Sequence, residues 1–130
     1  MRVLVTGGAG FIGSHLCDHL LADNHVVSVI DNLSTGRLEN IEHLMSNPAF
    51  RFEVGSILNE KVLTPLIEET DVVFHLAAAV GVQLILKDPV CSIETNIRGT
   101  EIVLDLAARR GTRVLLASTS EVYGKSKKIR

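Results

Sequence analysis

Short apolar runs alternate along the chain with longer segments in which apolar residues recur at the spacing of a helix. Residues 3–5 form an apolar run that ends near a pair of glycines, which is typical of a strand buried on both faces of a parallel sheet. Ile12, Leu16 and Leu20 then recur every four residues and predict a helix over residues 11–22. The same pattern predicts further strands at residues 26–30, 50–54, 72–76 and 113–117, helices at residues 38–45, 60–68 and 89 to about 109, and a loop over residues 118–130.

Five strands that alternate with helices predict an α/β domain of the Rossmann type. Each parallel pair of strands needs a crossover connection, and such crossovers are right-handed, so we expect a doubly wound parallel sheet flanked by helices. The expected strand order is 3-2-1-4-5. The pattern stops after the fifth strand with no closing helix. Residues 1–130 are therefore expected to be a single domain of a longer protein, truncated after the fifth strand.

Composition and charge narrow the class of protein. Hydrophobic residues make up 46% of the chain and charged residues 22%, which is ordinary for a compact globular domain. The formal net charge of −2 gives no reason to expect nucleic acid or an anionic membrane surface as a partner, and no apolar stretch is long enough to span a bilayer. Cys17 and Cys91 lie in predicted helices with no metal or redox spacing, so we expect reduced thiols and a cytoplasmic location.

Three glycines stand at the junction of the first predicted strand and the first predicted helix. Gly7, Gly10 and Gly13 would let the backbone turn tightly and approach a pyrophosphate, which the free N–H groups at the helix N-terminus then bind. A glycine motif alone is weak, because such a turn can serve only helix–strand packing. Its position in a strand–turn–helix unit favours dinucleotide binding.

Asp31 ends the second predicted strand, where a carboxylate accepts hydrogen bonds from the adenosine ribose and repels a 2′-phosphate. The sequence therefore predicts NAD rather than NADP as the cofactor. Arg37 could pair with a 2′-phosphate, although a surface arginine is the simpler interpretation. His15 and His19 have the spacing of a helical zinc pair, but they lack a third ligand, so we expect no metal site.

The segment TGGAGFIGSHL (residues 6–16) closely resembles the opening of extended short-chain dehydrogenases that act on nucleotide sugars. DNLSTG (31–36), HLAAA (75–79) and TNIRGT (95–100) are similar to three further motifs of that family, so the resemblance covers essentially the whole chain. Many relatives have an aspartate for the adenine amino group where this chain has Ser56, which implies a weaker adenine contact. The resemblance implies these cofactor-binding residues: Gly7, Gly10, Phe11, Ile12, Gly13, Asp31, Asn32, Ser34, Gly36, Ser56, Ile57, Leu76, Ala77, Ala78 and Asn96.

STSEVYG (118–124) resembles the end of the fifth strand in this family, where a catalytic serine or threonine precedes the tyrosine by four residues. That position is Thr119, whose hydroxyl would orient the 4-hydroxyl of the sugar. Thr119, Ser120 and Glu121 together resemble the triplet of UDP-glucuronate decarboxylases, and sugar dehydratases carry a similar acidic pair. Tyr123 and Lys127 match the family's Tyr-x-x-x-Lys spacing, but Tyr123 follows the fifth strand too closely to lie on the next helix, so we interpret the match as coincidental.

The resemblance implies that residues 1–130 are the NAD-binding domain of a nucleotide-sugar enzyme. The expected activity is 4-epimerisation or a related reaction through transient C4 oxidation of a UDP-sugar, with a UDP-glucuronate decarboxylase or a sugar 4,6-dehydratase as the alternative. Residues 77–82 look more like those of 4-epimerases. A non-catalytic NAD(H)-binding module is the alternative of another class. Relatives commonly form homodimers, and this fragment alone is expected to bind NAD without turnover.

Overall fold

The computed structural model describes residues 1–79 and 88–124, apart from the side chains of Ser120 and Glu121. Its centre is a parallel sheet in the order β3-β2-β1-β4-β5, which confirms the predicted doubly wound fold. Strand boundaries differ from the predicted ones by one residue at most. The strands are β1 (Arg2–Thr6), β2 (Val26–Asp31), β3 (Phe50–Val54), β4 (Val72–His75) and β5 (Arg113–Leu116).

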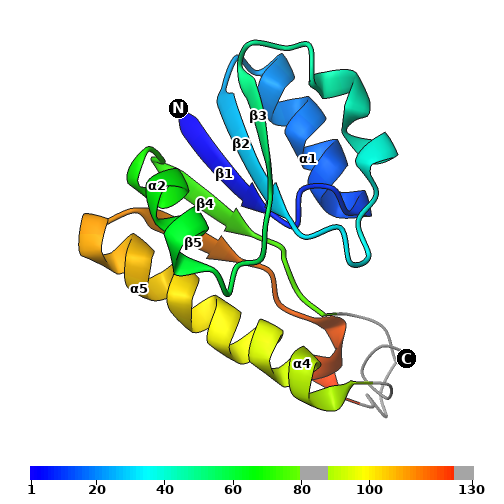
Figure 1. The fold of residues 1–130 in the computed structure, drawn as a ribbon, viewed down its shortest axis with the longest axis vertical. Coiled ribbons are helices and arrows are strands. Elements are labelled where there is room, and N and C mark those ends of the chain that lie inside the picture. Colours follow the sequence, from blue (N-terminus) through cyan, green and yellow to red (C-terminus); the bar gives the residue numbers. More distant parts are fainter. Residues whose placement is uncertain (80–87, 125–130) are drawn as a thin grey trace, which may run out of the picture.

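Helices cover both faces of the sheet (Figure 1). On one face lies α1 (Phe11–Ala22), and on the other lie α2 (Glu60–Glu68) and α5 (Thr100–Arg110). Side chains alternate between the faces along each strand. Val3 and Val5 of β1 therefore pack with the α1 side of the core, whereas Leu4 packs with the α2 and α5 side.

The prediction of a helix over residues 38–45 is wrong. Two short 3-10 helices stand there instead, η1 (Leu38–Asn40) and η2 (Glu42–Leu44), with hydrogen bonds between residues three apart. Only Ile41 and Leu44 are buried in this stretch. Their separation of one 3-10 turn lets both side chains enter the core without a full amphipathic helix.

The long helix predicted from residue 89 is present but is not uniform. It begins as α4 (Pro89–Ile93), passes through a π-helical segment, η3 (Glu94–Gly99), and continues as α5. Asp88 caps its start through a hydrogen bond from the Cys91 N–H to Oδ1 (3.0 Å). Gly111 ends it with a left-handed φ of 69°. Within the described part of the predicted loop after β5, residues 118–124, lies a 3-10 helix, η4 (Ser120–Tyr123).

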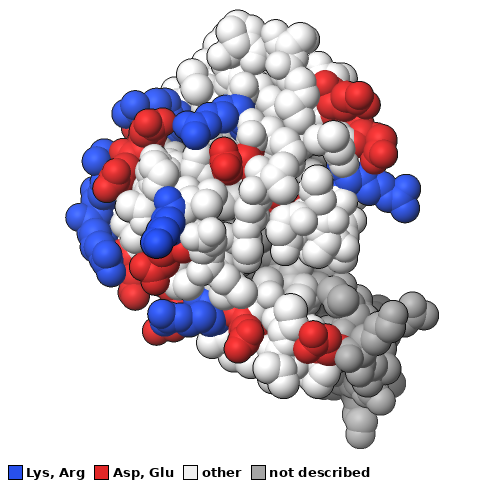
Figure 2. All heavy atoms as spheres, viewed as in Figure 1, with Lys and Arg blue, Asp and Glu red and all other residues white. Residues whose placement is uncertain are grey.

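Acidic and basic side chains are interspersed on the face shown in Figure 2. Among the exposed ion pairs, Arg98 of η3 pairs with Glu101 of α5 (2.7 Å) and approaches Glu60 of α2 (4.0 Å). Such exposed pairs contribute little to stability. Among the helices of the described ranges, none combines the length and apolar character that a membrane crossing requires.

Candidate functional site

At the junction of β1 and α1, three glycines leave no room for a side chain, namely Gly7, Gly8 and Gly13. Gly7 has a φ of 72°, and a Cβ there would lie 2.8 Å from the Ala77 nitrogen. A Cβ on Gly13 would overlap the Gly7 carbonyl oxygen and lie 2.6 Å from the Gly8 Cα. At Gly10, in contrast, only the Gly7 oxygen lies nearby, at 3.2 Å, and Gly10 borders an open cavity. Gly10 is therefore the glycine whose missing side chain leaves space for a ligand.

Gly10 is also the N-cap of α1, and no side chain caps this helix end. The first helical N–H groups have no partner within the helix, so they and the positive end of the helix dipole face the cavity as an anion-binding site. This arrangement suits a phosphate group. Phe11 and Ile12 of the first turn also line the cavity.

Asp31, at the end of β2, is buried beside this turn. Its Oδ2 accepts a hydrogen bond from the Ala9 N–H (2.9 Å), and its Oδ1 accepts one from the Leu33 N–H (2.8 Å). The carboxylate therefore ties the glycine turn to the loop after β2. A carboxylate can accept about four hydrogen bonds, so two acceptor positions remain for the hydroxyls of a ribose. A Cβ on Gly36 would lie 3.0 Å from Asp31 Oδ2, so this glycine keeps the loop close to the carboxylate.

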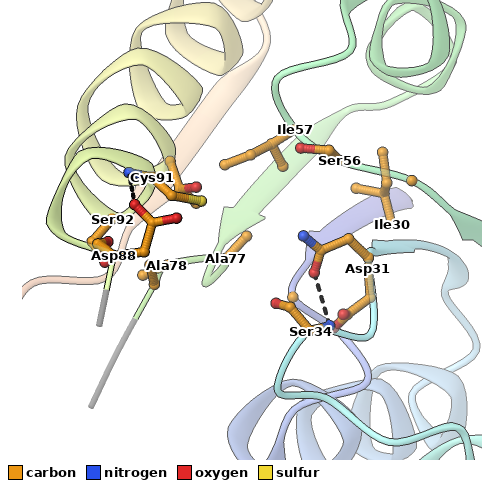
Figure 3. Close-up of a pocket in the computed structure, with 15 residues that line it drawn as sticks. Ile30, Asp31, Ser34, Ser56, Ile57, Ala77, Ala78, Asp88, Cys91 and Ser92 are labelled. Carbon is orange, nitrogen blue, oxygen red and sulfur yellow. Dashed lines mark hydrogen bonds between the residues drawn. The ribbon is translucent and has the colours of Figure 1, made fainter. Parts of the chain in front are cut away.

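A first cavity of about 150 Å³ lies between the loops after β2 and β3 and the start of α4. Figure 3 shows Asp31 and Ser34 on one side, Asp88, Cys91 and Ser92 on the opposite side, and Ala77 between them. The predicted residues Asn32, Ser56, Ile57 and Ala78 also line it. Ser56 Oγ accepts a hydrogen bond from the Leu58 N–H (3.2 Å), so the serine that replaces the usual aspartate is partly engaged with its own loop.

A second, more open cavity of about 970 Å³ continues from the glycine turn to the end of β5. The predicted residues that line it share the carboxyl edge of the sheet or the helices that flank this edge. They are Gly7, Gly10, Phe11, Ile12, Gly13, Asp31, Gly36, Leu76, Ala77, Ala78, Asn96 and Thr119. Together the two cavities bring every predicted cofactor-binding residue into one continuous region, and their roles there stay predictions.

Seven residues that line the first cavity were not predicted from the sequence, and four of these lie together at the start of the long helix. Asp88, Cys91, Ser92 and Thr95 line the wall opposite Asp31. Their spacing of three, four and seven residues places them on one face of the helix that begins at Pro89. The available signal was the polar face at the start of the helix predicted from residue 89, whereas the family motif begins only at Thr95.

The predicted catalytic residues are only partly described. Thr119 lines the second cavity, whereas the side chains of Ser120 and Glu121 and all of Lys127 lie outside the described part of the chain. Tyr123 belongs to η4, which begins four residues after the end of β5, and its side chain is exposed. Its interpretation as a coincidental match stays a prediction. In the ranges 1–79 and 88–124 there is no cluster of three metal-binding side chains.

His75 of β4 is a buried, hydrogen-bonded core histidine. Its Nδ1 lies 2.7 Å from Thr6 Oγ1, and its Nε2 lies 3.0 Å from Thr100 Oγ1. Burial lowers the pKa of His75 below the ordinary value of 6.5, because the charged ring would lose its hydration. The ring is therefore neutral at physiological pH.

This pKa shift predicts a pH-dependent stability. The unfolded chain takes up a proton on this histidine near pH 6.5, but the folded chain does so only at lower pH. The stabilisation is therefore fully present above about pH 6.5 and is lost as the pH falls through the folded pKa. Urea unfolding at about pH 7.5 and 5.5 is expected to show a smaller pH-dependent loss for His75→Gln than for the unaltered chain. His19→Gln, which removes an exposed histidine, is the control; an equal loss in all three proteins would contradict the assignment.

Comparison with known proteins places this geometry in a family. The model for the family described as GDP-mannose 4,6 dehydratase matches residues 4–130. A UDP-glucuronic acid decarboxylase 1 from Danio rerio is 46% identical over 95% of this chain, which spans 28% of that relative's length.

Two solved structures share both the fold and the sequence pattern. A dTDP-glucose 4,6-dehydratase from Streptomyces venezuelae with NAD bound is 37% identical, with a TM-score of 0.91, over 98% of this chain and 42% of its own. A UDP-glucose 4-epimerase from Thermotoga maritima with UDP-glucose is 36% identical, with a TM-score of 0.86, over 99% of this chain and 41% of its own. Because the family model covers nearly the whole chain, the chain belongs to the GDP-mannose 4,6 dehydratase family of extended short-chain dehydrogenases, which confirms the resemblance seen in its motifs.

Proposed function

We propose that residues 1–130 form an NAD-binding domain. The observation that carries this proposal is the open space at Gly10, where the uncapped end of α1 and the buried Asp31 carboxylate border the same cavity. A diphosphate fits the N–H groups of the helix end, and a ribose fits the remaining acceptor positions of Asp31. The negative charge of Asp31 disfavours a 2′-phosphate, so NAD is the expected form. The NAD-bound dehydratase of Streptomyces venezuelae supports this choice.

The proposed contacts divide between the two cavities. Ser56 and Ile57 would contact the adenine, and Asn32, Ser34 and Gly36 would adjoin the adenosine ribose. The second cavity would receive the pyrophosphate and the nicotinamide half, beside Leu76, Ala77, Ala78 and Asn96. When bound, NAD supplies a hydride acceptor. The protein's part is to hold it beside the end of β5, where the Thr119 hydroxyl would orient a sugar hydroxyl for proton removal.

The longer protein is proposed to oxidise a UDP-sugar at C4. Epimerisation, dehydration and decarboxylation differ in what then happens to the 4-keto sugar. Decarboxylation of a UDP-hexuronate is favoured by the Thr119–Ser120–Glu121 triplet and by the 46% identity to a UDP-glucuronic acid decarboxylase. A 4-epimerase is the second candidate, because residues 77–82 resemble epimerases and one epimerase structure is 36% identical. A non-catalytic module is disfavoured because Thr119 borders the cofactor cavity.

The outcome can be tested on the longer protein with UDP-glucuronate and UDP-glucose. Release of CO₂ from UDP-glucuronate, with formation of a UDP-pentose and no net consumption of NAD, is expected for the decarboxylase. Conversion of UDP-glucose to its 4-epimer without CO₂ release would instead establish the second candidate. Turnover of neither sugar, in a protein that binds NAD, would support the non-catalytic module.

The longer protein is further proposed to be a cytoplasmic homodimer. The exposed face of the helix from Pro89 to Arg110 carries four large apolar side chains, Val90, Ile93, Ile97 and Leu104. A stripe of this kind favours a helix-to-helix contact between subunits. Both cysteines are free thiols, which suits a reducing compartment.

The NAD proposal is tested by calorimetric titration of the 130-residue chain with NAD and NADP. We expect NAD to bind with micromolar affinity and NADP to bind more weakly, by about tenfold or more. Gly10→Ala is expected to lower the NAD affinity about tenfold or more, because the added methyl enters the cavity, while the free energy of unfolding changes by about 1 kcal/mol or less.

Gly111→Ala is the matched control for this titration. Because Gly111 has a φ of 69°, the alanine is expected to lower the free energy of unfolding by about 1 kcal/mol. No atom lies within 4 Å of the added Cβ, and Gly111 lies away from both cavities. Its NAD affinity is therefore expected to stay unchanged. The proposed site would be refuted if the folded chain did not bind NAD, or if Gly10→Ala bound NAD as tightly as the unaltered chain does.

A further inference from the structure

A path of hydrogen bonds, buried where Thr6 meets His75, runs along the wall of the second cavity. Thr6 of β1 lies on one side of the ring and Thr100 at the start of α5 on the other, at 2.7 and 3.0 Å. The His75 side chain is only 2% exposed. Both ring nitrogens are thus committed to hydroxyl groups.

The direction of every bond in this path follows from proton counting. The Thr100 hydroxyl donates its one proton to the Asn96 carbonyl oxygen (2.7 Å), so Thr100 Oγ1 can only accept from His75. His75 Nε2 must therefore carry the proton, and Nδ1 of the neutral ring must accept from the Thr6 hydroxyl. Thr6 Oγ1 in turn accepts from the Ala77 N–H (3.1 Å). Each group in the path therefore donates to the next one, starting at the Ala77 N–H and ending at the Asn96 carbonyl oxygen.

The two ends of this path hold the segment that follows β4. Ala77 is fixed by Thr6 through the bond just described. Ala79 is fixed by the side-chain amide of Asn96, whose Oδ1 accepts from the Ala79 N–H (2.7 Å) and whose Nδ2 donates to the Ala79 carbonyl (3.1 Å). Residues 76–79, Asn96 and Thr100 all line the second cavity. The path thus connects β1, the segment after β4 and the π-helical segment under one cavity wall.

We infer that His75, fixed as the neutral Nε2–H tautomer, is a positioning residue that locks residues 76–79 onto the π-helical segment η3 and so shapes the nicotinamide side of the cofactor site. The part of this inference that concerns the cofactor rests on the proposed NAD binding. The lowered pKa of His75 agrees with it, because protonation of Nδ1 would remove the acceptor of the Thr6 hydroxyl. π-Helical segments often lie at functional sites, as η3 does here.

The tautomer is read directly by long-range ¹H–¹⁵N NMR on the ¹⁵N-labelled 130-residue chain, with His75→Gln to assign the signals. The expected spectrum shows a protonated Nε2 and an unprotonated Nδ1 for His75 at neutral pH. A protonated Nδ1 would overturn the inference, because the bond to Thr6 would then run the other way. This measurement does not depend on NAD.

The positioning role is tested with Thr100→Val and Thr100→Ser. Valine removes the hydroxyl at constant shape, whereas serine keeps it. Thr100→Val is expected to weaken NAD binding about fivefold and to leave the binding of AMP, which fits the Asp31 side alone, within about twofold. Thr100→Ser is expected to restore NAD binding. Equal losses for NAD and AMP, or no loss at all, would overturn the positioning role.

Amide hydrogen exchange separates this inference from the proposed function. In Thr100→Val, the amides of Ala77 and Ala79 are expected to exchange faster, while that of Leu4 in the central strand does not change. If the unaltered chain binds neither NAD nor AMP, the NAD proposal fails, but the exchange result still decides the positioning role. Unchanged exchange at Ala77 and Ala79 would overturn it.

Discussion

Replacing Gly13 with alanine is expected to lower the free energy of unfolding of the chain by about 3 kcal/mol or more. The added Cβ would overlap the Gly7 carbonyl oxygen and lie 2.6 Å from the Gly8 Cα, and both atoms belong to the backbone. Unlike a flexible side chain, the turn cannot yield without separating α1 from β1. Urea unfolding followed by circular dichroism measures this loss directly.

Gly10→Ala is the matched control for this substitution. Its Cβ meets only one atom, at 3.2 Å, so its stability is expected to fall by about 1 kcal/mol or less. The two substitutions therefore separate a glycine required by packing from a glycine required by the ligand. Equal destabilisation by both would show that the turn yields as a unit and would contradict this division.

Replacing Asp31 is expected to have the largest effect on cofactor binding. Asp31→Ala should lower the NAD affinity about a hundredfold, because it removes a charged ribose acceptor and leaves the Ala9 and Leu33 N–H groups without their partner. Asp31→Asn keeps one acceptor oxygen and loses the charge. It should bind NAD about tenfold more weakly and lose most of its preference for NAD over NADP. Titration calorimetry with both dinucleotides measures the two effects.

Glu39→Gln controls for a general effect of negative charge near the site, since Glu39 is an exposed carboxylate of η1. Its NAD affinity and its preference over NADP should equal those of the unaltered chain. Should Asp31→Asn keep the full preference for NAD, the carboxylate charge is not what excludes a 2′-phosphate. The assignment of Asp31 as the selecting residue would then be wrong.

The sheet could be predicted from the sequence because each strand is a short apolar run and each connection is long enough for a crossover. The stretch that was predicted incorrectly, residues 38–45, shows what pattern alone misses. Arg37 N–H and the Asn40 side chain both donate to the Ala9 carbonyl oxygen. These contacts, to a residue far away in the sequence, hold the segment in two 3-10 turns, and no local periodicity reports them.

The site was predicted in part for a similar reason. The glycines and Asp31 stand at fixed places relative to β1 and β2, so their meeting follows from strand order alone. The hydrogen bonds that the Ala9 and Leu33 N–H groups donate to Asp31 could not be predicted, because backbone groups have no sequence signature. The π-helical segment was equally hidden, since Glu94–Gly99 has the residue pattern of an ordinary helix.

The central place of β1 in the sheet has a consequence for vectorial synthesis. Thr6 and His75 are in contact across a separation of 69 residues, and β1 obtains its second neighbouring strand only when β4 has been made. The pairing of β1, β2 and β3 and the bond from Ala9 to Asp31 need only the first part of the chain. Contacts across such long loops form slowly. The side of the cavities formed by Asp31 and the loop after β2 is therefore expected to assemble early on the ribosome, and the side that carries Asn96 and Thr100 is expected to assemble late.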